Sequence, residues 1–167
     1  MHVLLYQPEI PPNTGNIARL CAAARIGLHL VEPLGFRLED RYLKRAGLDY
    51  WPLVDMHVWP SLDAYLAAFP ARRLIMTSAK GNGMPAHRFP FAWEDTLLFG
   101  RETSGLPDDV LALSPHRVRI PFAPEVRREE HSACVRSLNL STAAGIIVYF
   151  ALERCGILDA WSGAPSP

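Results

Sequence analysis

The sequence predicts an α/β protein with a mostly parallel sheet flanked by helices. Short apolar runs of strand length alternate with segments whose apolar residues recur at helical spacing, a pattern typical of strands joined by crossover helices. The chain has 167 residues, 49% of them hydrophobic, and it shows neither an internal repeat nor a linker that would divide it. We therefore expect residues 1–160 to form a single domain and residues 161–167 to be a disordered tail.

The first predicted strand covers residues 3–6 and ends where Pro8 interrupts the apolar run. A helix is expected to start near Asn13 or Thr14, since either side chain can cap the free amides of a first turn. Apolar residues at helical spacing follow, and Gly27 is expected to end this helix as a left-handed cap.

The next elements continue the alternation of strands and helices. A strand is expected at residues 28–31, followed by a short helix at 40–46. The pattern then predicts a weaker strand at 53–58 and a helix at 61–69, with Ser61 as its cap.

The second half of the chain repeats this order. Strands are predicted at residues 74–77 and 96–99, then a helix at 108–113 and a last strand at 117–120. One long apolar helix is expected over residues 139–155.

Charge and cysteine content limit the class of protein. The 17 Lys and Arg balance the 17 Asp and Glu, which argues against a protein that coats nucleic acid without specificity, although arginines cluster at 37–45 and 127–136. No apolar run approaches the roughly 20 residues of a membrane span, and the first residues do not resemble an export signal. Cys21 and Cys155 fall on apolar helical faces, which favours free thiols, so we expect a cytoplasmic protein.

Two glycine-rich segments lack residues that common nucleotide-binding loops need. The G-x-G at residues 81–83 has no third glycine and no helix directly after it. The glycines of segment 100–105 have the spacing of a P-loop, but Leu106 stands where that loop has its lysine. No metal site is expected either, because no second ligand pair accompanies the candidates His116, His131 and Cys134.

Three strand ends carry more glycines and amides than their turns require. At the first, Asn13, Asn16 and Arg19 occupy the first turns of a helix that leaves the carboxyl end of a strand, with Asn16 and Arg19 on one helical face. One cap would suffice there, whereas two amides are present.

The second and third junctions follow later strands. Two glycines flank Glu102 in segment 100–105, which lets a ligand approach the backbone at the edge where open α/β sheets bind ligands. A simple tight turn, the alternative, would need one glycine. At the third junction Asn139 or Ser137 caps the long helix, whose positive end is then directed toward the same edge.

With these junctions the chain resembles the SPOUT class of RNA methyltransferases. It is most similar to the TrmL type, which methylates the ribose 2'-hydroxyl of the wobble cytidine or uridine in tRNA. The similarity extends from about residue 3 to residue 155. The matching segments are YQPEIPPNTGNIARLC (6–21), EPLGF (32–36), RAGLDY (45–50), FGRETSGLP (99–107), RIP (119–121) and SLNLS (137–141).

The resemblance implies a particular fold and cofactor. The C-terminal part of the sheet would be threaded as a deep trefoil knot, and the protein would be a homodimer whose subunits share each active site. The knot loops would bind S-adenosylmethionine, leaving S-adenosylhomocysteine as product. The implied cofactor-binding residues are Thr77, Gly100, Ile120, and Ser137 or Leu138.

The resemblance also implies roles in catalysis. Arg19 would act on the 2'-hydroxyl, and because a guanidinium is a poor base we expect it to position that group rather than remove its proton. Asn13 or Asn16, Glu102 and Asn139 would hold Arg19, the ribose and the cofactor.

The implied substrate is the anticodon loop of a tRNA, in particular a leucine tRNA, and no metal is required. Segment 125–136 is longer than the TrmL type leads us to expect, and two interpretations of it stay open: its charges contact RNA, or the segment is a disordered loop. Two alternatives stay open: methylation of another tRNA position or of ribosomal RNA, and a cofactor- and RNA-binding protein without catalysis. An enzyme acting on a phosphorylated metabolite is disfavoured by the missing phosphate loops.

Overall fold

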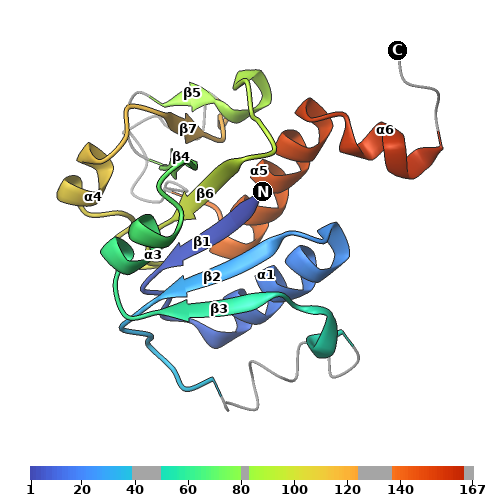
Figure 1. The fold of residues 1–167 in the computed structure, drawn as a ribbon. Helices are drawn as coiled ribbons and strands as arrows, with labels where there is room; N and C mark the ends of the chain where they lie inside the picture. The colour runs from blue at the N-terminus through green and yellow to red at the C-terminus, as the bar shows by residue number, and fades with distance from the viewer. Residues whose placement is uncertain (39–49, 80–82, 124–136, 164–167) are drawn as a thin grey trace.

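A computed structural model of the protein describes residues 1–38, 50–79, 83–123 and 137–163 (Figure 1). Within these residues seven strands form one sheet in the order β3-β2-β1-β6-β4-β7-β5, and every pairing is parallel. The strands are β1 (His2–Tyr6), β2 (Gly27–Val31), β3 (Met56–Trp59), β4 (Arg73–Thr77), β5 (Met84–Pro85), β6 (Asp95–Phe99) and β7 (Arg117–Arg119).

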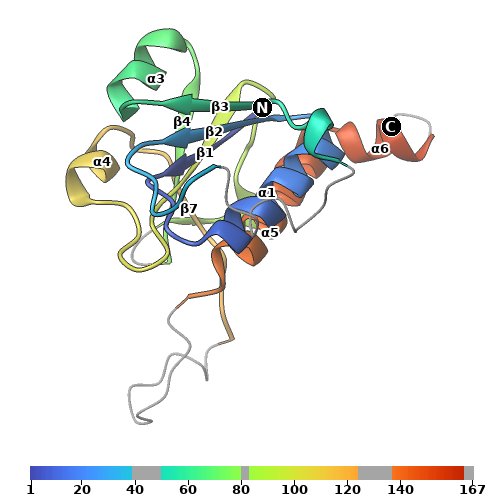
Figure 2. The same ribbon diagram turned by 90° about the horizontal axis from the view of Figure 1, so that it is seen from below.

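Helices cover both faces of this sheet, so the predicted fold class is confirmed. Helices α1 (Pro11–Ala24) and α5 (Leu140–Arg154) pack against each other on one face, while α3 (Leu62–Ala68) and α4 (Asp108–Ala112) lie on the other (Figure 2). Helix α6 (Ile157–Ser162) follows α5 and projects from the body (Figure 1). Two 3-10 turns complete the list, η1 (Trp51–Leu53) and η2 (Ala86–Arg88). No helix among the described residues has the length and apolar character needed to cross a membrane.

Two apolar clusters hold the helices to the sheet, because successive strand residues point to opposite faces. Leu5 of β1 lies in one cluster with Ile17 of α1 and Ile147 of α5. Its neighbour Leu4 lies in the other, with Tyr65 of α3. Strand β1 is therefore buried on both faces, between β2 and β6, and its carboxyl end is firmly placed in the middle of one sheet edge.

The start of α1 differs from the prediction that Asn13 or Thr14 caps it. The helix begins two residues earlier, at Pro11, and its N-cap residue Ile10 makes no side-chain capping bond. Proline suits a first turn because the amide it lacks would have no partner there. Asn13 and Thr14 are buried within that turn, so their side chains are directed to other parts of the fold.

The end of α1 also differs from the prediction. Arg25, not Gly27, takes the left-handed conformation, with φ 52°, and its amide bonds to the Ala22 carbonyl. Gly27 is instead the first residue of β2, where an added Cβ would lie 3.1 Å from His29 Nε2. Crowding within the sheet, rather than a helix cap, therefore explains this glycine.

The C-terminal residues are more ordered than expected. Helix α6 includes Trp161 and Ser162, so the predicted disordered tail is wrong for these two residues, and residues 164–167 lie outside the described part. The helix expected at 40–46 and the insertion at 125–136 also lie outside it. Ser61 caps α3 as predicted, its Oγ accepting the Ala64 amide at 3.1 Å.

Candidate active site

The predicted cofactor residues follow three strands that are neighbours in the sheet. Thr77 ends β4, Gly100 follows β6 and Ile120 follows β7, and these strands are adjacent in the order β6-β4-β7. The Thr77 hydroxyl donates to the Leu98 carbonyl at 2.9 Å and fastens the ends of β4 and β6 together. Parallel strands end at one edge, so all three residues lie at the carboxyl edge, where open α/β sheets bind ligands.

The loop after β6 is closed on itself by its backbone. The Arg101 amide donates to the Gly105 carbonyl at 3.2 Å, and the Gly105 amide donates to the Arg101 carbonyl at 2.9 Å. A Cβ on Gly100 would lie 2.2 Å from the Gly105 carbonyl carbon, while Gly105 has a φ of +74°. The two glycines thus serve two separate needs, close approach at Gly100 and a left-handed backbone at Gly105. The chain itself fills the space that we expected a ligand to approach at Gly100.

Glu102 joins this loop to the start of α1. Its carboxylate accepts the Glu9 amide at 2.9 Å, the Ile10 amide at 3.3 Å and the Asn13 side-chain amide at 3.1 Å. The Glu9 carboxylate reciprocates by accepting the amide and hydroxyl of Thr103, at 3.1 and 2.8 Å. Because Glu102 already has three donors from its own chain, its evident task is to hold the two segments in place.

Asn13 continues the connection to α5. Its Oδ1 accepts the Asn139 side-chain amide at 2.9 Å, while its Nδ2 donates to Glu102. Asn139 Oδ1 in turn accepts the Ser141 and Thr142 amides at 2.9 and 3.3 Å, which confirms Asn139 as the N-cap of α5. An asparagine can both donate and accept, so Glu102, Asn13 and Asn139 form one hydrogen-bonded chain across the three junctions.

Asn16 and Arg19 lie apart from this chain. Both are exposed on α1, and at 3.6 residues per turn Arg19 is about 120° around the helix from Asn13. The Arg19 guanidinium lies 5.6 Å from the centre of the Tyr50 ring, and the Tyr50 hydroxyl donates to the Gly15 carbonyl at 3.0 Å. The structure therefore brings together three of the five predicted catalytic residues and leaves Arg19 exposed on the surface of α1.

The remaining predicted cofactor residues precede α5. Ser137 is exposed and Leu138 is half-buried, directly before the cap at Asn139. Ile120 is also half-buried and packs against the core on the α1 and α5 face. Leu138 thus offers apolar surface next to Asn139 in the sequence, and Ile120 offers it after β7, whereas Ser137 offers only an exposed polar group.

Sequence reasoning missed a second connection at this edge. The Arg101 guanidinium donates to the Gln7 side chain and lies 5.9 Å from the centre of the Tyr6 ring. Gln7 has a φ of 51° and donates through Nε2 to the Glu32 carbonyl at 3.3 Å. No local pattern marks these residues, because each partner comes from a different strand end.

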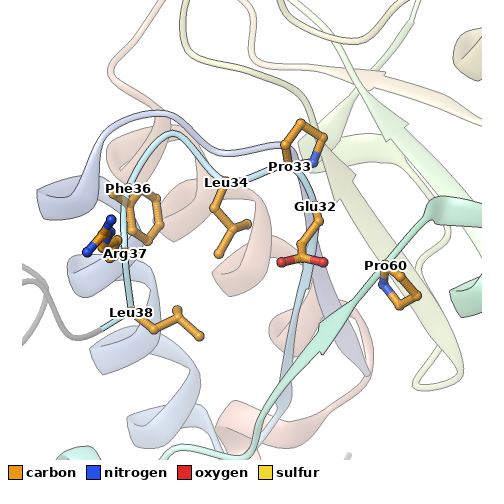
Figure 3. Close-up of a pocket in the computed structure, with 7 residues that line it drawn as sticks. All are labelled: Glu32, Pro33, Leu34, Phe36, Arg37, Leu38 and Pro60. Carbon is orange, nitrogen blue, oxygen red and sulfur yellow. The ribbon is translucent and has the colours of Figure 1, made fainter.

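An open hollow of about 640 Å³ occupies the same edge further along, where β2 and β3 end. Segment 32–38 and Pro60 line it, and Figure 3 shows the Glu32 carboxylate in the middle of the lining, between Leu34 and Pro60. This hollow is separate from the β6-β4-β7 loops. No group of three or more metal-binding side chains occurs among the described residues.

Comparison with known proteins identifies the relatives of this chain. The model of the SpoU rRNA Methylase family matches residues 1–149. The chain belongs to the SpoU methylase family. A tRNA (cytidine(34)-2'-O)-methyltransferase of Aeromonas hydrophila is 43% identical over 159 residues, which cover 93% of this chain and 95% of that protein. The family and this full-length similarity identify the chain as a methyltransferase of the predicted SPOUT class.

Solved structures agree with this membership. One, described as giving structural insights into the 2-OH methylation of C/U34 on tRNA, has a TM-score of 0.81 and 44% identity, covering 95% of this chain and 96% of that one. The SpoU methyltransferase AviRb from Streptomyces viridochromogenes, solved with the cofactor AdoMet, has a TM-score of 0.78 and 26% identity. That alignment covers 92% of this chain and 57% of AviRb.

Proposed function

We propose that this protein transfers a methyl group from S-adenosylmethionine to the ribose 2'-hydroxyl of nucleotide 34, a cytidine or modified uridine, in tRNA. The names of full-length relatives support the substrate. The hydrogen-bonded chain of Glu102, Asn13 and Asn139 carries the proposal, because it aligns the three loops of the carboxyl edge. We further propose the anticodon loop of a leucine tRNA as the target, a cytoplasmic location, and a C-terminal trefoil knot.

The residues at this edge suit S-adenosylmethionine. Ile120 and Leu138 provide half-buried apolar surface for an adenine, and the loop after β6 ends at the same sheet edge as Ile120. A position above Gly105 is open, with no atom within 4 Å of where a Cβ would be. The bound cofactor would supply an electrophilic methyl carbon on a sulfonium, and S-adenosylhomocysteine would remain.

The chain's own residues then have to place the nucleophile. In this proposal Arg19 holds the 2'-hydroxyl and the neighbouring backbone of the RNA, since a guanidinium has five donors and does not deprotonate. The hydroxyl proton passes to solvent or to a phosphate oxygen. Alignment of the hydroxyl with the methyl carbon accounts for the rate gain, as in other reactions of held reactants.

A homodimer would complete each site. Arg19 is exposed and separate from the Glu102–Asn13–Asn139 chain of its own subunit. Helix α5 is apolar on nearly all sides, yet only Ala144, Ile147, Val148, Ala151 and Leu152 are buried by the core. Tyr149, on another side of it, is 49% exposed. A helix that is apolar all round normally has cover all round, and a second copy of this chain would supply it.

Nucleotide-level mapping tests the proposed function. Bulk tRNA from a strain that lacks the gene is incubated with the protein and labelled S-adenosylmethionine, and the methylated ribose is located in the product. The expected result is a 2'-O-methyl group at nucleotide 34. A methyl group at another tRNA position or in ribosomal RNA would replace the substrate assignment, and no transfer to any RNA would refute the reaction.

A further inference from the structure

The hollow beside β2 and β3 has no role in the proposed reaction, although it lies at the same edge as the catalytic loops. We propose that this hollow is a subsite for a nucleobase of the RNA substrate that carries an exocyclic amino group, which is adenine, cytosine or guanine but not uracil. The proposal rests on the proposed function, since it names a part of the substrate that the same site would hold.

The chemistry of the lining favours such a base. The Glu32 carboxylate is exposed and lies centrally in the hollow (Figure 3). An ionised carboxylate only accepts hydrogen bonds, and the amino groups of cytosine, adenine and guanine donate them, whereas uracil has no amino group. Leu34 and Phe36 contribute apolar surface on the other side of the hollow, and single-stranded bases stack on aromatic rings.

The charges at the hollow fit RNA better than a small anion. Arg37 is exposed at the rim, where a guanidinium can contact a phosphate of the backbone. A free phosphorylated metabolite is disfavoured, because Glu32 places negative charge in the centre of the lining. The combination of one central acceptor and one cation at the rim matches a base with its attached phosphate.

The hollow is held at a fixed place relative to the catalytic loops. Gln7 accepts a hydrogen bond from Arg101 of the β6 loop and donates to the Glu32 carbonyl. The Gly35 amide donates to the Pro8 carbonyl at 2.9 Å, and a Cβ on Gly35 would lie 2.7 Å from the Glu9 Cα. The rim therefore packs directly on the segment that contacts the β6 loop.

The distance between the hollow and the β6 loop is close to the size of one nucleotide. Strands β2 and β6 are two places apart in the sheet, about 10 Å at the usual strand spacing. An RNA whose target ribose lies at the β6 loop thus has the base of that nucleotide, or of the next one, within reach of Glu32.

Binding of anticodon stem-loops tests the subsite. Fluorescence anisotropy measures the Kd of wild type, Glu32→Ala and Glu32→Gln for a set of RNAs. In each RNA one base loses its amino group: an adenosine is replaced by purine riboside, a cytidine by uridine or a guanosine by inosine. Wild type is expected to bind one of these altered RNAs about tenfold more weakly than the unmodified RNA, which is the loss expected for one base contact. Glu32→Ala loses about tenfold on unmodified RNA and nothing more at that position, while Glu32→Gln, which keeps an acceptor oxygen, loses less.

The controls separate a base contact from a general charge effect. Removal of a carboxylate that merely lies near a polyanion strengthens binding, so a loss on Glu32→Ala points to a direct contact. Asp159→Ala, which removes an exposed carboxylate on α6, should match wild type. Thermal unfolding confirms that each variant is folded.

Several outcomes would overturn the subsite. The first is a Kd of Glu32→Ala within twofold of the wild-type Kd, and the second is a lower Kd for this variant than for wild type. The third is that Glu32→Ala weakens binding by the same factor for every altered RNA, so that no single base position depends on Glu32. If wild type binds with the expected pattern but transfers no methyl group, the proposed function fails while the subsite stands. If wild type does not bind RNA, both fail.

Discussion

Replacement of Asn13 by alanine should remove the central member of the hydrogen-bonded chain at the sheet edge. Asn13 is 5% exposed and makes one bond to the Glu102 carboxylate and one to the Asn139 amide. A bond to a charged group contributes roughly 1.5–3 kcal/mol and a neutral one roughly 0.5–1.5 kcal/mol, so the free energy of unfolding should fall by about 2–4 kcal/mol. Asn139 would still cap α5, but the hydrogen bonds that connect the β6 loop to that helix through Asn13 would be lost.

Urea unfolding at one protein concentration, followed by circular dichroism, measures this change. Asn16→Ala is the matched control, since it removes the same group from an exposed position one turn along α1, where the expected change is below about 0.5 kcal/mol. Asn13→Asp should cost more than Asn13→Ala, because it puts a second carboxylate against Glu102. If Asn13→Ala unfolds at the same urea concentration as Asn16→Ala, the chain of hydrogen bonds does not stabilise the fold as argued.

Three further variants and conditions test separate parts of the structure. Arg19→Ala should abolish methyl transfer while the Kd for S-adenosylhomocysteine, measured by calorimetry, stays within about threefold of wild type; wild-type turnover would refute the role of Arg19. Gly100→Ala should lower the thermal unfolding temperature by more than Gly105→Ala does. A Cβ at residue 100 would lie 2.2 Å from the Gly105 carbonyl carbon, whereas a Cβ at residue 105 meets no atom and only strains a positive φ, at a cost of roughly 1–2 kcal/mol. The reverse order would contradict the loop geometry. Burial, with a smaller contribution from His57, lowers the pKa of His29 from 6.5 to about 4. Below pH 6.5 the unfolded chain therefore binds a proton at His29 that the folded protein does not. The free energy of unfolding, at its full value above pH 6.5, should fall by up to about 1.4 kcal/mol per pH unit as the pH decreases toward 4. His2, whose pKa burial lowers from 6.5 to about 3, contributes to the same fall in stability. The urea midpoint should therefore fall less steeply across this range in His29→Gln than in wild type, and an unchanged slope would rule out a contribution from His29.

Local signals in the sequence predicted most elements of the fold. The alternation of apolar strands and helices gave a parallel sheet with helices on both faces, and Ser61 and Asn139 each cap the helix that follows them. Each of these caps bonds to amides two or three residues further along the chain. The local sequence is therefore sufficient to predict them.

The predictions were wrong where residues distant in the sequence determine the role of a side chain or glycine. Asn13 was interpreted as a cap because its neighbours allow one, but its partners Glu102 and Asn139 lie 89 and 126 residues away. Gly27 was interpreted as a helix end, yet an added Cβ there would also lie 3.3 Å from His2 Cδ2, a neighbour from another strand that is present only once the sheet has formed. The placement of Asn13, Glu102 and Asn139 at one sheet edge was expected from the strand ends and from the resemblance, but neither spacing nor periodicity indicates the hydrogen bonds that join them.

The position of β1 has a consequence for synthesis on the ribosome. This strand precedes the other strands in the sequence but becomes a central strand, with β2 on one edge and β6 on the other. It can pair with β2 early, whereas His2 cannot meet Thr96 until the residues between them, which include β2, β3 and β4, have been made. An open apolar edge is a template for wrong pairing, so the nascent chain depends on shielding of that edge until β6 arrives.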